Sequence, residues 1–243
     1  MKRMLFKLCL LLFVIIVGLG SELKFMPVIA DSSSISSLAE LKTRIASNLL
    51  IRNEEFSVQY SGDKDELSAS LPAVIMEALE TDDYTGYIVD SYFYTIQTWS
   101  SNAKIKLEFV YRESQEQTAF VDRRVSAILT DIIKNGMDDD QIVKQIHDWI
   151  IYNVAYDRSY QRYTAYDALD SGLAVCQGYS LLANKMLNMA GIPSRIVEGT
   201  VATGDHAWNL VQVDGVWYHM DVTWNDPLPD RGRKADYTYF FFY

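Results

Sequence analysis

The sequence predicts an α+β protein, in which helices and antiparallel strands occur in separate runs. Apolar residues recur at helical spacing over 38–49 and 121–132. Apolar and charged residues alternate over 103–111, which is typical of a half-buried strand. Asp214-Gly215 separates two β-rich runs and is the preferred dipeptide of a two-residue type I′ hairpin. With 49% hydrophobic residues in 243, the chain can bury a substantial core.

The first 30 residues predict a secretory signal peptide. Three basic side chains lie within the first seven positions, and an apolar run over 8–20 follows that is too short to span a membrane. Small residues near Ala30 offer a cleavage site. We therefore expect a secreted or cell-surface protein with no stable membrane span after cleavage. The stretch 21–30 between the apolar run and the cleavage site is long for a signal peptide, so an uncleaved membrane anchor is the alternative.

The rest of the chain is strongly acidic and retains one cysteine. A net charge of −10 for the whole chain and +3 for residues 1–30 leave −13, which disfavours nucleic acid and anionic lipid as partners. Cys9 lies inside the signal, so Cys176 has no cysteine with which to form an internal disulfide. An unpaired cysteine in an exported protein is either a reactive thiol or a small buried apolar residue.

Residues 31–112 are expected to form a small α/β companion domain, whose tyrosines serve packing or, as the alternative, line a binding surface. Pro72 predicts a kink or a fresh start in its second helix. The expected elements are a helix capped by Ser37, a strand over 55–60, a helix from Asp63 to about Glu80, and strands over 87–99 and 103–111.

Residues 113–243 are expected to form the second domain, which carries the chemistry. His147 and Asp148 are adjacent in one predicted helix, so we expect them to point to different sides and to form no dyad. We interpret His147 as a packing or surface residue. The expected elements are a helix through 121–132, a helix capped by Asp138, a helix that starts at Cys176 and ends before Gly191, a strand over 195–200, and the hairpin over 206–221.

Cys176 is predicted in the first turn of its helix. Free backbone N–H groups and the helix dipole favour negative charge there, so the thiolate is favoured over the thiol. A thiolate in this position is a nucleophile, and a neighbouring base is needed to take up the proton that the thiol loses.

The hairpin supplies such a base. Its two-residue turn sets a register in which Trp208 lies opposite Asp221 and His206 lies opposite Thr223. His206 and Asp221 are then diagonal neighbours on one face, with Cβ atoms about 7 Å apart, which is within reach of an imidazole–carboxylate contact. The carboxylate can hold one ring nitrogen and leave the other free to take a proton.

Two alternatives remain at this stage. His219 shares the face and flanks Asp221, so it is a second candidate for the base. A zinc site made by Cys176, His206, His219 and Asp221 is the other alternative, although the sequence offers no closely spaced ligand pair such as CxxC.

These motifs, in this order, resemble the core of the bacterial transglutaminase-like (papain-like) superfamily of cysteine proteases and acyltransferases, in its exported type. The resemblance covers about residues 140–229. The matching pieces are Ile146-His147-Asp148-Trp149, Ala174-Val175-Cys176-Gln177-Gly178-Tyr179, His206-Ala207-Trp208-Asn209 and Asp221-Val222-Thr223-Trp224-Asn225-Asp226-Pro227.

The resemblance implies a papain-like fold, with the cysteine helix packed on a small antiparallel sheet. It implies acyl transfer on protein or peptide amides, by hydrolysis or by transfer to an amine, with Cys176 as nucleophile, His206 as base and Asp221 as orienting residue. No cofactor or metal is expected, and cell-surface or wall peptides are candidate substrates. A non-catalytic surface-binding or assembly module with the same fold is the alternative. The expected substrate-binding or supporting residues are Gln177, Tyr179, Trp208 and Trp224.

Overall fold

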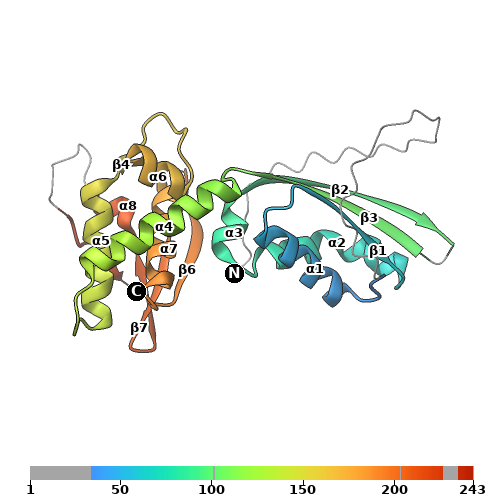
Figure 1. Ribbon diagram of the computed structural model, residues 1–243, viewed down its shortest axis with the longest axis horizontal. Helices are drawn as coiled ribbons and strands as arrows, with labels where there is room; N and C mark the ends of the chain where they lie inside the picture. The colour runs from blue at the N-terminus through green and yellow to red at the C-terminus, as the bar shows by residue number, and fades with distance from the viewer. Residues whose placement is uncertain (1–33, 101, 203, 227–234, 243) are drawn as a thin grey trace. The chain divides into compact units, whose positions relative to one another are not determined.

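The protein is described by a computed structural model, in which the predicted signal peptide, 1–30, lies outside the described residues. Figure 1 labels most of the elements, which are numbered in chain order. Among the described residues, no helix is both long enough and apolar enough to cross a membrane. The described residues are 34–100, 102–202, 204–226 and 235–242.

The described residues divide into two compact units. The N-terminal unit contains 34–81 and 89–111, and the C-terminal unit contains 82–88 together with the residues from 112 onward. The sequence-based division placed one boundary after residue 112. The structure differs from it because 82–88 pack with the C-terminal unit.

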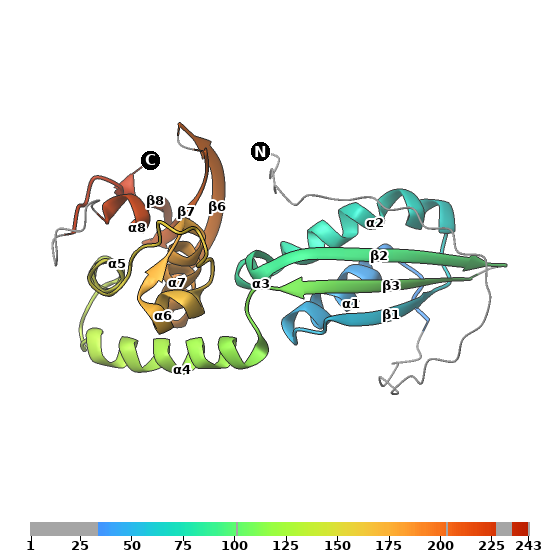
Figure 2. The ribbon, with the colours of Figure 1, turned by 90° about the horizontal axis from the view of Figure 1, so that it is seen from above.

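In the N-terminal unit, a three-stranded antiparallel sheet of order β1-β3-β2 carries two helices on one face (Figure 2). The predicted alternation over 103–111 is present, since Ala103, Ile105, Leu107 and Phe109 are buried against the helices. The elements are α1 (Leu38–Leu50), β1 (Glu55–Tyr60), α2 (Lys64–Leu79), β2 (Val89–Trp99) and β3 (Asn102–Tyr111).

The fresh start expected at Pro72 does not occur, because α2 runs unbroken from Lys64 to Leu79. A proline removes the hydrogen bond to the carbonyl four residues earlier, here Ser68. Pro72 and Ser68 are both exposed, so water can reach that carbonyl. The buried side chains on the opposite face, such as Leu67 and Leu71, keep the helix on the sheet.

The expected strand over 87–99 begins later than its composition indicated. Residues 83–88 form a short helix, α3 (Asp83–Ile88), and β2 starts at Val89. The helix is held by the C-terminal unit: Asp83 accepts hydrogen bonds from Arg195 Nε at 2.7 Å and from the Ile196 amide at 2.9 Å. Contacts with residues more than a hundred positions away therefore override local β propensity.

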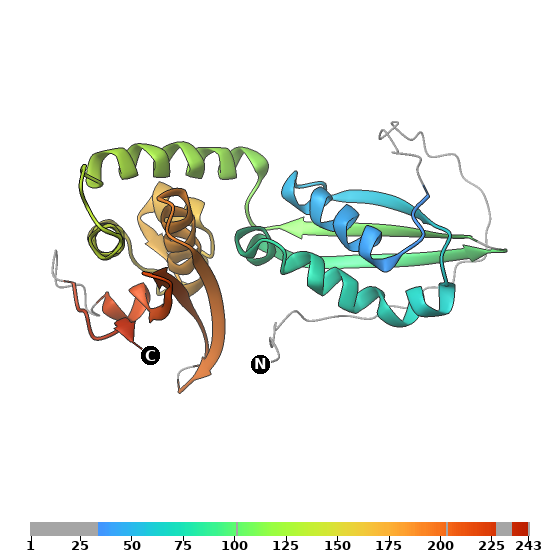
Figure 3. The ribbon, with the colours of Figure 1, turned by 90° about the horizontal axis from the view of Figure 1, so that it is seen from below.

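In the C-terminal unit, α7 is the central element. It packs against the helices α4, α5 and α6 and against the strands β6 and β7 (Figure 3). The sheet is antiparallel, four-stranded and of order β6-β7-β8-β9. The remaining elements are α4 (Gln115–Ile132), α5 (Asp139–Asn153), β4 (Ala155–Tyr156), α6 (Ala165–Ser171), β5 (Leu173–Ala174), α7 (Cys176–Met189), β6 (Ser194–Val201), β7 (Gly204–Val213), β8 (Val216–Met220), α8 (Val222–Asn225) and β9 (Phe240–Phe242).

The α+β class is confirmed, and so is the cysteine helix on a small antiparallel sheet. The hairpin turn is also as predicted, because Val213 pairs with Val216 across Asp214-Gly215. Asp214 and Gly215 both have positive φ, at 49° and 77°, which a type I′ turn requires.

Candidate active site

Cys176 is the first residue of α7 and is partly exposed. Val175 precedes it in an extended conformation, with φ −85° and ψ 175°, and no side chain caps the helix. The first turn therefore directs backbone N–H groups toward the region around the sulfur, where they favour negative charge. The predicted position of the cysteine at a helix start is confirmed.

The backbone that leads to Cys176 is held by the loop before it. β4 pairs in parallel with β5, and the Val175 amide donates to the Arg162 carbonyl at 2.8 Å. Asp157 organises this loop, because its carboxylate accepts from Ser159 Oγ at 2.6 Å and from the Gln161 amide at 2.9 Å. These hydrogen bonds hold the pKa of Asp157 well below its usual range.

Gly178 allows the first turn of α7 to approach that loop. A Cβ at this position would lie 2.8 Å from the Ala174 Cβ and 3.0 Å from the Thr164 carbonyl oxygen. The glycine two residues after Cys176 is thus required by close packing.

His206 and Asp221 form a short hydrogen bond, with 2.6 Å between Nε2 and Oδ2. Their exposed fractions are 8% and 1%. The ladder between β7 and β8 ends at Asn209 and Met220, so the expected pairs of Trp208 with Asp221 and of His206 with Thr223 do not form.

Asp221 instead leaves the strand and caps α8. Its Oδ1 accepts from the Trp224 amide at 3.0 Å, while Oδ2 contacts His206. Its own amide donates to the Tyr239 carbonyl at 2.9 Å. The expected contact between His206 and Asp221 therefore forms, but not through pairing in the sheet. Asp221 is the N-cap of α8, and this position turns its carboxylate toward the imidazole.

The surroundings of His206 shift the pKa of its imidazole. Burial opposes its charged form, but hydrogen bonds with Asp221 and Cys176 and their negative charge prevail and raise the pKa to about 9. Because Nε2 donates to Asp221, Nδ1 is the nitrogen left to exchange a proton with the sulfur. His206 is thus an imidazolium at neutral pH, beside Cys176.

Two indole rings flank this imidazole. Trp224 stacks on it at 4.8 Å between ring centroids and 16° between planes, and Trp208 at 5.8 Å and 21°. The Trp208 Nε1–H donates to His219 Nδ1 at 2.7 Å. Of the two candidate bases, His206 thus contacts Asp221, and His219 holds the tryptophan beside it.

Gln177 and Tyr179 connect α7 to its surroundings. The Gln177 amide donates to the Tyr87 carbonyl of α3 at 2.8 Å. The Tyr179 hydroxyl donates to Asp226 at 2.6 Å, and the tyrosine is completely buried. These hydrogen bonds tie the first turn of α7 to α3 and to the residue that follows α8.

The expectation that His147 and Asp148 cannot pair is wrong, because His147 Nδ1 lies 3.0 Å from Asp148 Oδ1. Adjacent helix positions start in different directions, yet the two side chains are long enough to meet. His147 is fully buried, as a packing residue would be. It also contacts Asn225 of α8, a residue to which sequence reasoning gave no role.

Tyr156 was missed as well. Burial and the nearby Cys176 raise its pKa to about 12, so its half-buried phenol shares the environment of the sulfur. As for the zinc alternative, among the residues described, no three His, Cys, Asp or Glu side chains gather in an arrangement able to hold a metal ion.

Comparison with known proteins identifies this region. Residues 126–222, which include Cys176, His206 and Asp221, match the family model of the transglutaminase-like superfamily. Kyphoscoliosis peptidase of Homo sapiens is 29% identical over 135 residues, which are 48% of this chain and 20% of that protein. Its Mus musculus counterpart is 28% identical over 138 residues, 49% of this chain and 21% of that protein. The chain thus spans about a fifth of the length of these relatives.

Solved structures are also similar. One of them, the crystal structure of a TGase, aligns with a TM-score of 0.43 and 14% identity, over 78% of this chain and 56% of that one.

Proposed function

We propose that the region matching the transglutaminase-like family model, residues 126–222, performs cysteine-dependent acyl transfer on protein or peptide amides. In this proposal Cys176 is the nucleophile, His206 the general base and acid, and Asp221 the residue that orients it. The supporting observation is the 2.6 Å hydrogen bond from His206 Nε2 to Asp221, which leaves Nδ1 for the sulfur.

The reaction begins from a thiolate and an imidazolium. The Cys176 sulfur attacks the carbonyl carbon of an amide, and the carbonyl oxygen takes up the electron pair as an oxyanion. The Cys176 backbone N–H is placed at the start of α7, where it can stabilise that oxyanion. His206 then donates its proton to the leaving amine, and collapse of the intermediate gives a thioester on Cys176.

Resolution of the thioester regenerates the enzyme. Either water or an amine attacks the thioester carbonyl, His206 takes a proton from the attacking atom, and the thiolate leaves. Water yields a hydrolase product, and a lysine amine yields a cross-linked product. The role of Asp221 is to keep Nε2 protonated and the ring in place through both halves.

We also propose that the protein is exported and meets its substrates at the cell surface or in the wall. The basic start of the chain and the apolar run over 8–20 support this. Expression of the full chain in a bacterial host, with mass measurement of the protein outside the cytoplasm, tests it. Cleavage near Ala30 is expected, and retention of all the protein in the cytoplasm contradicts export.

The catalytic proposal is tested by alkylation and turnover. We expect iodoacetamide to label Cys176 faster than free cysteine near neutral pH, and Cys176→Ala to abolish labelling. A library of glutamine-donor and amine-acceptor peptides then distinguishes hydrolysis from amine transfer. Labelling no faster than free cysteine, with no turnover of any peptide, would contradict the proposal and favour a non-catalytic binding module.

A further inference from the structure

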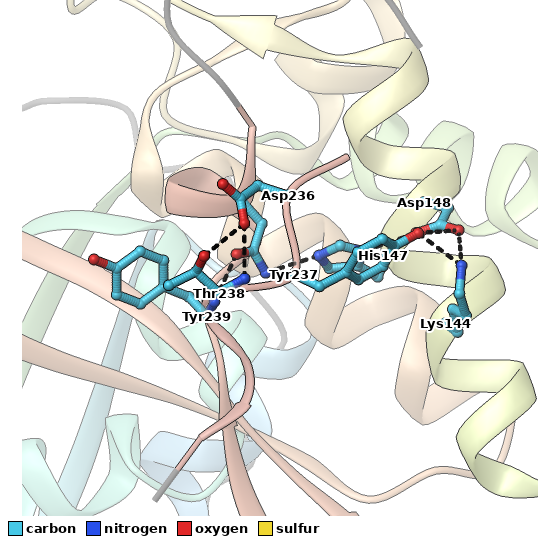
Figure 4. Close-up of polar contacts among 8 residues, drawn as sticks. Lys144, His147, Asp148, Asp236, Tyr237, Thr238 and Tyr239 are labelled. Atoms are coloured by element: carbon cyan, nitrogen blue, oxygen red, sulfur yellow. Dashed lines mark hydrogen bonds and ion pairs between the residues drawn. The ribbon is translucent and has the colours of Figure 1, made fainter. Parts of the chain in front are cut away.

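A second histidine–aspartate pair lies in the C-terminal unit, between α5, α8 and the segment 235–242 (Figure 4). His147 Nδ1 lies 3.0 Å from Asp148 Oδ1, and Nε2 lies 2.9 Å from Asn225 Nδ2. The Tyr237 ring stacks on the imidazole at 5.3 Å, and Phe240 meets it edge-on at 4.9 Å. The ring is thus enclosed on its faces and hydrogen-bonded at both nitrogens.

The contacts of Asn225 determine which protons His147 carries. Asn225 Oδ1 accepts from the Tyr239 amide at 2.8 Å, so the NH₂ group is the end that faces His147. Nε2 must then accept, and Nδ1–H must donate to Asp148. Burial favours this neutral form by lowering the pKa of His147, although Asp148 acts in the opposite direction.

Other charged groups around the ring are already paired with one another. Lys144 forms an ion pair with Asp148, and its ammonium donates to the Tyr237 hydroxyl at 2.7 Å. The Tyr237 hydroxyl in turn donates to Asp148 at 2.8 Å. On α8 and β9 the groups that meet the ring are the neutral Asn225 amide and the Phe240 ring.

Asn225 joins this cluster to the carboxylate at the other end of α8. Its amide donates to the Asp221 carbonyl at 3.1 Å, and its carbonyl accepts from the Asp236 amide at 3.0 Å. Tyr239 contacts both ends of the helix, since its carbonyl accepts from the Asp221 amide at 2.9 Å. A four-residue helix has little stability of its own, so these contacts set its position.

We propose that neutral His147 is a positioning residue for the triad: by accepting a hydrogen bond from Asn225 it fixes α8, and thereby the Asp221 carboxylate against His206. The inference rests on the proposed function, but it concerns a residue that contacts none of the three reacting side chains in the hydrogen bonds described above. A proton on His147 Nε2 would oppose the Asn225 NH₂ group, so the contact exists only in the neutral form.

Two conservative substitutions separate the two hydrogen bonds of His147. In His147→Gln the side-chain oxygen reaches the place of Nε2 and can accept from Asn225. In His147→Asn the shorter amide reaches only the place of Nδ1, so it keeps the Asp148 contact and loses Asn225. Both are neutral and differ by one methylene, which makes each the control for the other.

The readout is the pKa of His206, measured by NMR titration of the full chain with 15N-labelled histidine. We expect His147→Gln to keep the value near 9, and His147→Asn to lower it by about one unit, which is a tenfold weaker hold on the proton. An unchanged His206 pKa in a folded His147→Asn variant overturns the inference.

If His147→Asn does not fold, the unsubstituted protein still decides the matter. In the unsubstituted protein, the NMR signal of the His206 Nε2 proton should shift at the acidic pH at which His147 becomes protonated. A signal that does not shift at that pH overturns the inference. Slow labelling of Cys176 in the unsubstituted protein would contradict the proposed function alone, because the pKa of His206 reports positioning whether or not the sulfur reacts.

Discussion

His206 and Asp221 are joined by a 2.6 Å hydrogen bond although the hairpin ladder does not pair them. The ladder stops at Met220, and the aspartate acts as the N-cap of α8. One carboxylate oxygen therefore anchors a helix while the other holds the imidazole. The orientation of His206 therefore depends on α8 as well as on the sheet.

Replacement of Asp221 by asparagine should reduce thioester formation by about 100-fold or more, because the general base loses its partner. The pKa of His206 should also fall from about 9 toward 6.5. Single-turnover kinetics and NMR titration measure the two effects. Asp205→Asn, the same change at an exposed site on β7, is the matched control and should alter neither.

The stability of the C-terminal unit should decrease as pH rises. The folded-state pKa of His206, about 9, lies above its ordinary value of 6.5, so the folded state binds this proton more tightly than the unfolded chain. The contribution, on the order of 3 kcal/mol, is complete below about pH 6.5 and is lost as pH passes through about 9. Urea unfolding from pH 6 to 10 measures it, and His206→Gln should flatten the curve. A curve as steep in that variant would assign the effect to other groups.

Trp224 should stabilise the imidazolium through its ring face. Loss of a partly exposed cation–π contact costs about 0.5–1 kcal/mol, so Trp224→Leu should lower the His206 pKa by about half a unit. Trp217→Leu serves as control, because Trp217 is 41% exposed and Trp224 is 40% exposed. Equal shifts in the two variants would indicate a general effect of surface aromatic residues.

Gly178→Ala should destabilise the protein by about 1–3 kcal/mol, because the new methyl group overlaps Ala174 and the Thr164 carbonyl. Cys176 alkylation should slow as the first turn of α7 shifts. Thermal unfolding and labelling rates measure both. A second substitution, Ala174→Gly, removes one of the two close contacts and should restore part of the stability; no recovery would place the strain at Thr164.

Local signals in the sequence predicted much of this fold. The caps at Ser37, Asp63 and Asp138 each receive the expected backbone N–H groups, because a cap depends only on residues within three positions. The hairpin turn was equally readable from Asp214-Gly215. Such features need no knowledge of the tertiary structure.

The failures have tertiary causes. Register counting extended the hairpin through Asp221, where capping of α8 and the Tyr239 carbonyl draw the chain out of the sheet. The pairing of His147 with Asp148 depends on a side-chain rotamer, and the role of Asn225 depends on a partner 78 residues away. Cys176, His206 and Asp221 could be named as candidates because the sequence offers one cysteine outside the signal and few histidines, and the structure brings His206 and Asp221 into contact.

The helix α3 gives the protein an interleaved construction. The chain enters the C-terminal unit for residues 82–88, returns to complete the N-terminal sheet, and enters it again at 112. A gene rearrangement that moved only residues 113–243 into another protein would leave behind the Tyr87 carbonyl that holds Gln177, the residue after Cys176. The two units should therefore be inherited together, and neither can be exchanged by a single crossover.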